Sequence, residues 1–264
     1  MSKQQLISFW DGPVTWLERL CVASMGQHHH PLAVYTYGDK SSLGADLGVE
    51  IRDARDILPE DSHYHKYRAE QRFGMFANIF RLYLLKYNKG TWVDLDCYFL
   101  KPLSSSSEHV FGFSSPNKIN NAVLRIAPNS ELIDDYISAI TADPLQIPWA
   151  SISRQLKRKF EIFKGQSQPH PNFKTNIGPK ALTYFVKKHG LLSYAQHQEV
   201  YYPLPAKEIS LLLQPEEQVL PKLTDNAIMI HAWRNTLKFQ GYLNSTPPAD
   251  SYIGKACRGY NVTN

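Results

Sequence analysis

Four short apolar runs in the first 100 residues have the length and composition of buried strands. They are rich in aromatic and β-branched residues, and Gly, Pro or Asp, which commonly end strands, stand at their borders. The runs occupy residues 5–10, 31–39, 49–59, where a short strand is followed by a turn, and 91–100. The pattern predicts several strands that are separated along the chain by other elements.

Two of the intervening segments have the features of helices. Pro13 favours the start of a helix over residues 14–25, because the φ of proline is already near the helical value. Between residues 65 and 88, apolar residues recur at spacings of three and four, which is one face of a helix, and Gly90 suits its C-terminal cap. The predicted order is therefore strand, helix, strand, strand, helix, strand.

The rest of the chain continues this mixture of elements. Strands are predicted at residues 120–128, 199–205 and 226–233, and helices at 130–140, capped by Ser130, and at 178–190, opened by Pro179 and ended by Gly190. Such alternation predicts an α/β, Rossmann-like fold with a mostly parallel sheet flanked by helices. Without an internal repeat or a long linker, we expect a single domain over residues 1–264, with halves at about 1–103 and 104–264.

The composition is that of a globular protein with a sizeable core, since 43% of the 264 residues are hydrophobic. The 29 Lys and Arg residues outnumber the 24 Asp and Glu residues and give a net charge of +5. The basic residues form neither a long run nor a zinc-finger spacing, so nucleic acid is not the expected partner. A modest positive charge suits an anionic small molecule or an anionic membrane surface.

The sequence has neither a signal-peptide-like N-terminus nor an apolar stretch long enough to span a membrane. Three widely spaced cysteines, Cys21, Cys97 and Cys257, favour buried thiols in a reducing compartment. We therefore expect a soluble, cytoplasmic protein. The basic segment 154–164 could make it peripheral to an anionic membrane, although such runs are more often solvated helix faces.

Asp94 and Asp96 place two like charges in the apolar run at residues 91–100. In a strand, residues two apart share a face, so these carboxylates would stand about 7 Å apart from a rise of about 3.3 Å per residue. They repel each other unless solvent or a cation lies between them. A hard divalent cation such as Mn²⁺ or Mg²⁺ binds carboxylate and phosphate oxygens together.

An Asp-x-Asp triplet arises easily by chance, so the pair indicates a cation site only if the surrounding sequence supports one. The two aspartates lie toward the C-terminal end of a predicted strand, where open α/β sheets bind their ligands. A solvated edge strand remains the structural alternative at this point.

Residues Phe73–Leu103 combine an amphipathic helix carrying Arg81, the turn "YNKG", the Asp-x-Asp triplet and a Pro-Leu pair, in that order. This segment resembles the glycosyltransferases with a DXD sugar-binding region. That GT32-like group includes capsular polysaccharide and α-1,4-galactosyltransferase types and is distantly related to the clostridial glucosylating toxins. Four other segments match in the family's order: "LISFWDG", "NNAVLRIAPNSELIDDYI", the Gly-Pro helix start at Gly178, and "IHAWRN".

The resemblance, which covers residues 6–235, implies a GT-A fold and a metal-dependent, retaining transferase of polysaccharide biosynthesis. It would move a hexose from a UDP-sugar to a glycan or lipid-linked saccharide, with Mn²⁺ or Mg²⁺ as cofactor. The first half would bind the nucleotide and the second the acceptor. The implied roles are catalysis for Arg81, Asp94 and Asp96; metal binding for Asp94, Asp96 and His231; and donor contacts for Trp10, Asn78, Arg81, Asn121 and Trp233.

Each of these roles has an ordinary structural alternative in the sequence. Trp10 could be plain core packing, Arg81 a surface ion pair, Asn121 the cap of a turn, and His231 a core histidine with its hydrogen bonds satisfied.

The chain departs from the family pattern at Asn78, where the family has an aspartate that holds the donor sugar's hydroxyls. An amide still forms hydrogen bonds with hydroxyls but brings no charge. A non-catalytic sugar-nucleotide or glycan-binding protein therefore remains an alternative. A metal-dependent phosphoesterase is a second one, and it would need a larger cluster of His and Asp at the strand ends.

Overall fold

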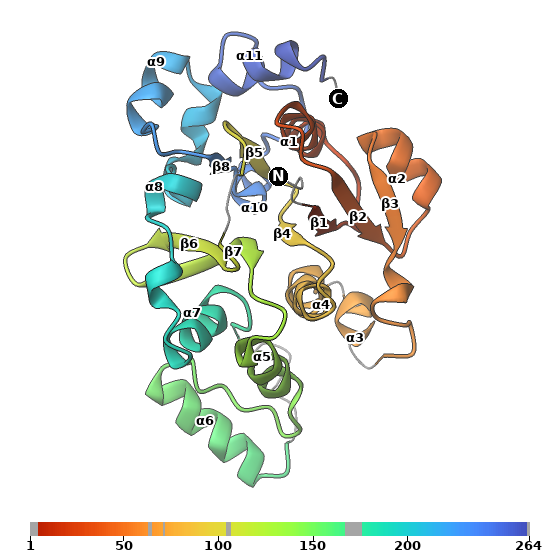
Figure 1. The fold of residues 1–264 in the computed structure, drawn as a ribbon, viewed down its shortest axis with the longest axis vertical. Coiled ribbons are helices and arrows are strands. Elements are labelled where there is room, and N and C mark those ends of the chain that lie inside the picture. The colour runs from red at the N-terminus through yellow and green to blue at the C-terminus, as the bar shows by residue number, and fades with distance from the viewer. Residues whose placement is uncertain (1–4, 63–64, 71, 104–106, 167–175, 263–264) are drawn as a thin grey trace.

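A six-stranded sheet with the order β3-β2-β1-β4-β7-β6 forms the framework of the protein in the computed structural model (Figure 1). Strand β1 pairs in parallel with β2 and β4, and β2 with β3, whereas β7 is antiparallel to β4 and β6. The strands are β1 (Leu6–Phe9), β2 (Leu32–Thr36), β3 (Glu50–Asp53), β4 (Thr91–Val93), β6 (Val110–Ser115) and β7 (Lys118–Arg125). The structure describes residues 5–62, 65–70, 72–103, 107–166 and 176–262.

Two short strands form a second, antiparallel sheet. They are β5 (Cys97–Phe99) and β8 (Met229–His231), and Cys97 lies opposite His231 in their register. This pairing brings the last part of the chain next to the Asp-x-Asp segment.

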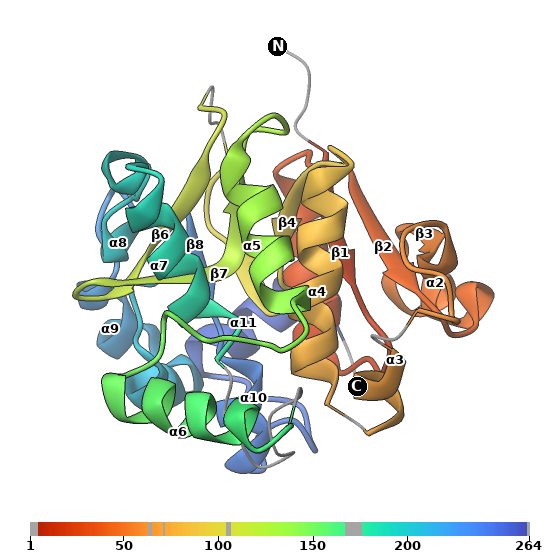
Figure 2. The same cartoon turned by 90° about the horizontal axis from the view of Figure 1, so that it is seen from below.

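Helices cover both faces of the main sheet, as Figures 1 and 2 show. The α-helices are α1 (Trp16–Gln27), α2 (Lys40–Leu47), α3 (His65–Ala69), α4 (Phe73–Lys86), α5 (Glu131–Thr141), α6 (Ile152–Phe163), α7 (Pro179–Lys188), α8 (Gln198–Tyr201), α9 (Glu216–Val219), α10 (Arg234–Phe239) and α11 (Tyr252–Gly259). Short 3-10 helices occupy Ala54–Asp56, Leu192–Tyr194, Ala206–Leu213 and Leu220–Lys222. Within the described residues, no helix is both long and apolar enough to pass through a membrane.

The two faces of the sheet contact different helices, because successive strand residues point to opposite sides. On one face, the ring of Phe9 packs against Phe76 and Phe80 of α4, with centroids 5.5 Å and 4.8 Å away. On the other face, Leu6 belongs to the same buried cluster as Met25 of α1. The α/β fold with a mostly parallel sheet flanked by helices is therefore confirmed.

The predicted helix over residues 65–88 is wrong in its extent. It is divided into α3 and α4, and α4 ends at Lys86. Asn88, with φ 51°, supplies the left-handed turn expected of Gly90. Gly90 is needed for another reason, since a Cβ there would lie 2.5 Å from the carbonyl oxygen of Gln5.

Other element boundaries also differ from the prediction. Helix α1 starts after Thr15 rather than Pro13, because Thr15 and Glu18 form a capping box. Strand β6 and helix α2 were not predicted; α2 has little amphipathic periodicity and is bounded by an Asp39 cap and by Gly48 at φ 65°. The predicted strand at residues 199–205 is wrong, because this segment begins inside α8.

The predicted continuous strand over residues 91–100 is interrupted at the two aspartates. Strand β4 ends at Val93, the next three residues form a turn, and β5 begins at Cys97. The backbone N–H of Asp94 still donates to Ala122 of β7, at 2.7 Å, and the chain then leaves the main sheet to pair with β8. Because β4 lies between β1 and β7, the alternative of a solvated edge strand is excluded.

Candidate functional site

The carboxyl ends of β1 and β4 border a cavity of about 770 Å³. Its walls come from separate segments of the chain: the end of β1, helix α4, the β4–β5 turn, strand β7, the start of α7 at Pro179, and the β8–α10 segment. Every site residue expected from the sequence lines this cavity: Trp10, Asn78, Arg81, Asp94, Asp96, Asn121, His231 and Trp233. The fold therefore brings the expected set together, while the role of each residue stays a prediction.

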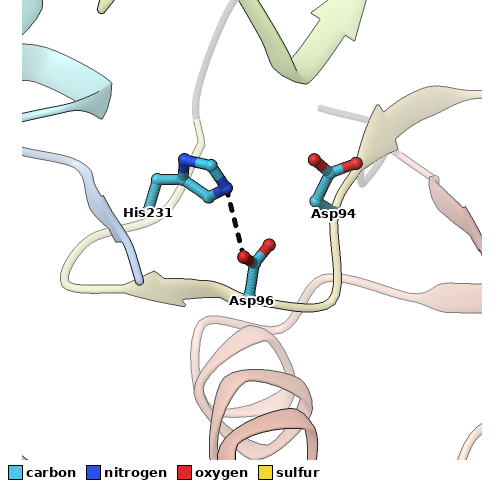
Figure 3. A group of neighbouring side chains, drawn as sticks. All are labelled: Asp94, Asp96 and His231. Atoms are coloured by element: carbon cyan, nitrogen blue, oxygen red, sulfur yellow. Dashed lines mark ion pairs between the residues drawn. The ribbon is translucent and has the colours of Figure 1, made fainter. Parts of the chain in front are cut away.

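Asp94, Asp96 and His231 form a cluster whose ligand atoms all lie within 4.8 Å of one another (Figure 3). The β5–β8 pairing produces it, because His231 lies opposite Cys97, the residue that follows Asp96. Figure 3 shows the two carboxylates on either side of the turn and the imidazole facing Asp96. His231 Nε2 lies 3.2 Å from Asp96 Oδ2.

Asp96 is the carboxylate that the surrounding groups keep ionised. Burial by itself would raise its pKa, but the charge and hydrogen bond of His231, together with the Arg234 N–H, lower its pKa below the usual value. That N–H donates to Asp96 Oδ2 at 2.8 Å. Conversely, burial would lower the pKa of His231, and Asp96 raises it above the usual value.

Asp94 is held by two donors on a single oxygen. Arg81 Nη2 and the indole Nε1 of Trp92 both donate to Asp94 Oδ1, each at 2.7 Å. Loss of solvation raises the pKa of Asp94, opposed by Arg81 and reinforced by the charge of Asp96. Within the described part of the chain, its second oxygen, Oδ2, accepts no hydrogen bond and remains available to a ligand.

Arg81 is a buried cation, so the surface ion pair considered from the sequence is excluded. Its side chain is 5% exposed, and its guanidinium lies 4.4 Å from the Trp92 ring centroid. Asn78 Oδ1 accepts from Arg81 Nη1 at 3.1 Å and from Asn121 Nδ2 at 2.8 Å. Asn121 lies inside β7, so it does not cap a turn.

The amide of Asn78 also constrains the start of α7. A Cβ on Gly178 would lie 3.0 Å from Asn78 Nδ2, so the side chain of residue 78 fits closely against this glycine. Asn78 thus joins α4, β7 and the entrance of α7 into one wall of the cavity.

Trp10 stands at the end of β1 and is half-buried rather than enclosed in the core. Its indole Nε1 donates to the carbonyl of Gly12 at 2.8 Å. The guanidinium of Arg234 lies 4.9 Å from its ring centroid. The tryptophan therefore offers an aromatic surface to the cavity beside a cation.

Two further residues of the site, Arg234 and its partner Glu18, were not predicted from the sequence. Arg234 Nε donates to Glu18 Oε1 at 2.5 Å, and Glu18 is completely buried in α1. The other oxygen of Glu18 accepts from the backbone and hydroxyl of Thr15, which completes the capping box. The "IHAWRN" segment contains Arg234 next to an expected site residue, and that adjacency was the available signal.

A second ion pair at the cavity was also missed. Asp11, which follows Trp10, pairs with Arg68, and the Arg68 guanidinium lies 4.6 Å from the ring centroid of Tyr37. These groups lie near the carboxyl ends of β1 and β2.

The cluster suits a divalent cation. Two carboxylates and an imidazole are common ligands of Mn²⁺, and Mg²⁺ binds carboxylates. His231 Nδ1 is buried and has no hydrogen-bond partner among the residues that the structure describes, so this is not a core histidine with satisfied hydrogen bonds. Among the described residues, no other His, Cys, Asp and Glu group has such spacing, and the larger cluster that a phosphoesterase would need is absent from them.

Comparisons with known proteins show the fold. No family model matches the chain, and neither does any curated protein. The solved structure named "PaToxG Glycosyltransferase" matches with a TM-score of 0.52 and 16% sequence identity, over 98% of this chain and 86% of that chain. The chain therefore has the GT-A-like fold of a glycosyltransferase, in a single domain.

Proposed function

We propose that this protein is a metal-dependent, retaining glycosyltransferase that transfers a hexose from a UDP-sugar to a hydroxyl of a glycan or lipid-linked saccharide. One observation carries the proposal: Asp94, Asp96 and His231 meet within 4.8 Å in a cavity of a glycosyltransferase-like fold. The DXD-family resemblance of residues 6–235 supports the same assignment. Residues 1–103 would form most of the nucleotide site, to which the His231–Arg234 segment of the second half would also contribute, and residues 104–264 would border the acceptor.

In this proposal, Asp94, Asp96 and His231 hold Mn²⁺ or Mg²⁺. When bound, the ion would neutralise the charge that develops on the diphosphate as it leaves. Carboxylate oxygens are the ligands that such hard cations prefer. Among the described residues, no hydrogen-bond donor occupies Asp94 Oδ2, so this oxygen is free to bind the ion.

Arg234 and Trp233 would contact the diphosphate beside this cluster. The backbone N–H of Arg234 donates to Asp96, and its guanidinium is fixed by Glu18. A fixed guanidinium stabilises phosphate charge without having to reorient during the reaction. Lys238, in the next turn of α10, lines the same cavity and adds a second cation.

Trp10 would stack on the uracil ring. Its indole edge is occupied by the Gly12 carbonyl, which fixes the ring plane at the end of β1. An aromatic face gains stacking energy with a base without requiring further hydrogen bonds.

Arg81, Asn78 and Asn121 would surround the donor sugar. Arg81 contributes a buried positive charge, and the two amides contribute donors and acceptors that suit sugar hydroxyls. Among the described residues that line the cavity, Asp11 is the one carboxylate besides Asp94 and Asp96, and Arg68 pairs with it. We therefore favour front-face substitution: the bond from the anomeric carbon to phosphate breaks, the acceptor oxygen bonds on the same face, and its proton passes to the leaving phosphate.

Asn78 also favours a second candidate function, a protein that binds a sugar nucleotide or glycan without turnover. The amide replaces the charged group that the family resemblance leads us to expect at this position, and its oxygen is already engaged by Arg81 and Asn121.

A donor screen separates the two candidates. UDP-sugars are incubated with the protein and Mn²⁺, and released UDP is measured for each donor. Slow hydrolysis of one donor supports the transferase. Tight UDP binding without turnover of any donor, with a panel of saccharide acceptors present, favours the binding protein.

The working location in this proposal is the cytoplasm, where nucleotide sugars would be available, with the protein peripheral to a membrane that carries a lipid-linked acceptor.

A further inference from the structure

Helix α6, Ile152–Phe163, exposes a continuous apolar stripe. Ile152, Leu156, Phe160 and Phe163 follow one another at spacings of four, four and three residues, so they lie on one side of the helix. Their exposed fractions are 76%, 60%, 57% and 87%. We call these four residues the α6 stripe, and an exposed apolar patch of this kind marks an interaction surface.

The opposite side of α6 is fixed to the protein by Arg158, which is 1% exposed. Arg158 Nε donates to the Leu145 carbonyl at 2.8 Å, and its Nη1 donates to the Gln166 carbonyl at 2.9 Å. Glu161 pairs with the same guanidinium at 3.3 Å. Rotation of the helix to bury the stripe would break these contacts of Arg158. The contacts therefore hold the stripe on the outward side of the helix.

Basic side chains border the α6 stripe on both edges. At about 100° per residue, Lys159 falls beside one edge and Lys157 and Lys164 fall beside the other. Lys164 Nζ lies 4.4 Å from the ring centroid of Phe160. Glu161 is the one acidic residue in the sequence 151–166, and it points inward to Arg158.

We propose that the α6 stripe docks on an anionic lipid bilayer. Apolar side chains would enter the boundary between headgroups and acyl chains, while the flanking lysines would contact lipid phosphates. The charges select this occupant, because a second copy of the chain would bring the same lysines face to face. No acidic side chain of α6 is directed outward to offset that repulsion.

Helix α6 and the candidate site face the same side of the molecule. Figure 2 shows α6 and α10, whose residues line the cavity, along the same lower edge, and Figure 1 shows that the two helices are separated along the long axis. The inference deepens the proposed function and rests on it for its purpose: docking would place the cavity on the side of a bilayer that holds a lipid-linked saccharide.

Vesicle sedimentation tests the docking without relying on turnover. The full chain is mixed with vesicles of phosphatidylcholine alone or of phosphatidylcholine with phosphatidylglycerol. We expect binding to the anionic vesicles and little to the neutral ones. The variant Phe160→Gln/Phe163→Gln should lower partitioning at least about tenfold, since each exposed ring loses its apolar burial.

The matched control is Leu192→Gln/Leu220→Gln, which removes two apolar side chains that are 39% and 52% exposed outside α6. It should bind vesicles as the parent does. Thermal unfolding, with a melting temperature close to that of the parent, checks that the fold of both variants is intact.

Three results would overturn the proposal: no binding to either vesicle, equal binding to both, or unchanged binding by the α6 variant. A concentration-dependent dimer that the α6 variant abolishes in sedimentation velocity would instead identify a second copy as the occupant. Failure of the donor screen leaves these vesicle results untouched, so the two failures are distinguishable.

Discussion

Arg234 and Glu18 join the two ends of the candidate site, although 216 positions separate them in the sequence. The carboxylate of Glu18 is completely buried in α1, and it holds the guanidinium of Arg234 beside the Trp10 ring. The same arginine donates its backbone N–H to Asp96. One residue therefore links the proposed base platform to the proposed metal site.

Glu18→Gln should weaken UDP binding, because a neutral amide no longer fixes the guanidinium at the cavity. We expect the Kd for UDP with Mn²⁺ to rise about tenfold, as for other charged pairs whose partner is removed. Calorimetry measures the Kd, and the melting temperature reports the separate loss of stability. The control is Asp46→Asn, which removes the exposed partner of Arg19 near the same helix and should change neither value appreciably. If Glu18→Gln and the parent bind UDP with equal affinity, Arg234 does not contact the diphosphate.

Trp10→Ala should weaken UDP binding by about tenfold or more, because a stacked base contributes on the order of 1–3 kcal/mol. Trp10→Phe keeps an aromatic face and should retain most of the affinity. Calorimetry gives both constants. If the Phe and Ala variants bind UDP equally well, the ring does not stack on the base.

From the sequence, it was easier to predict which segments come together than to predict the bounds and turns of each segment. Apolar runs marked β1 and β2 because burial of those residues is a local requirement. The division between Ala69 and Phe73 has no glycine or proline to signal it. The turn at Asp94–Asp96 depends on pairing between β5 and β8, whose residues lie far apart in the chain. The residues of the Glu18–Arg234 pair lie even farther apart in the chain, and no local pattern contains both of them.

Asn78→Asp should change the recognition of the donor sugar and leave the affinity for the nucleotide unchanged. A carboxylate at this position would pair with Arg81 and compete with Asp94 for it. It would also present charge to donor hydroxyls. We expect the KM for the best UDP-sugar, or the preferred donor, to change, while the Kd for UDP stays within about twofold, because the proposed function places this residue beside the donor sugar and away from UDP. A change in UDP affinity as large as the change in KM would contradict this assignment.

Asp96→Ala should abolish metal-dependent UDP binding. Asp96 is the carboxylate whose pKa is held low, so it is ionised and ready to bind a cation at neutral pH. Calorimetry with UDP, in the presence and absence of Mn²⁺, should show the difference between the two conditions disappear in the variant. Asp135→Asn is the matched control: it alters a surface aspartate paired with Lys188 and should keep the Mn²⁺ effect. Unchanged binding by Asp96→Ala would refute the metal site.

The affinity for Mn²⁺ should rise with pH across the range in which His231 loses its proton. Asp96 raises the pKa of His231, and the proton competes with the metal for the imidazole, so binding weakens as the pH falls through that raised value.

In the absence of metal, the stability of the fold changes with pH in the opposite direction to the Mn²⁺ affinity. The imidazolium–Asp96 pair stabilises the fold fully below the ordinary histidine pKa, and this stabilisation is lost as the pH rises through the raised value. Mn²⁺ titrations and metal-free thermal unfolding between about pH 6 and 8 measure the two opposite slopes, which span the range of histidine ionisation. His231→Asn keeps a polar side chain that does not titrate there, so both slopes should flatten. Parallel slopes in parent and variant would show that another group controls metal binding.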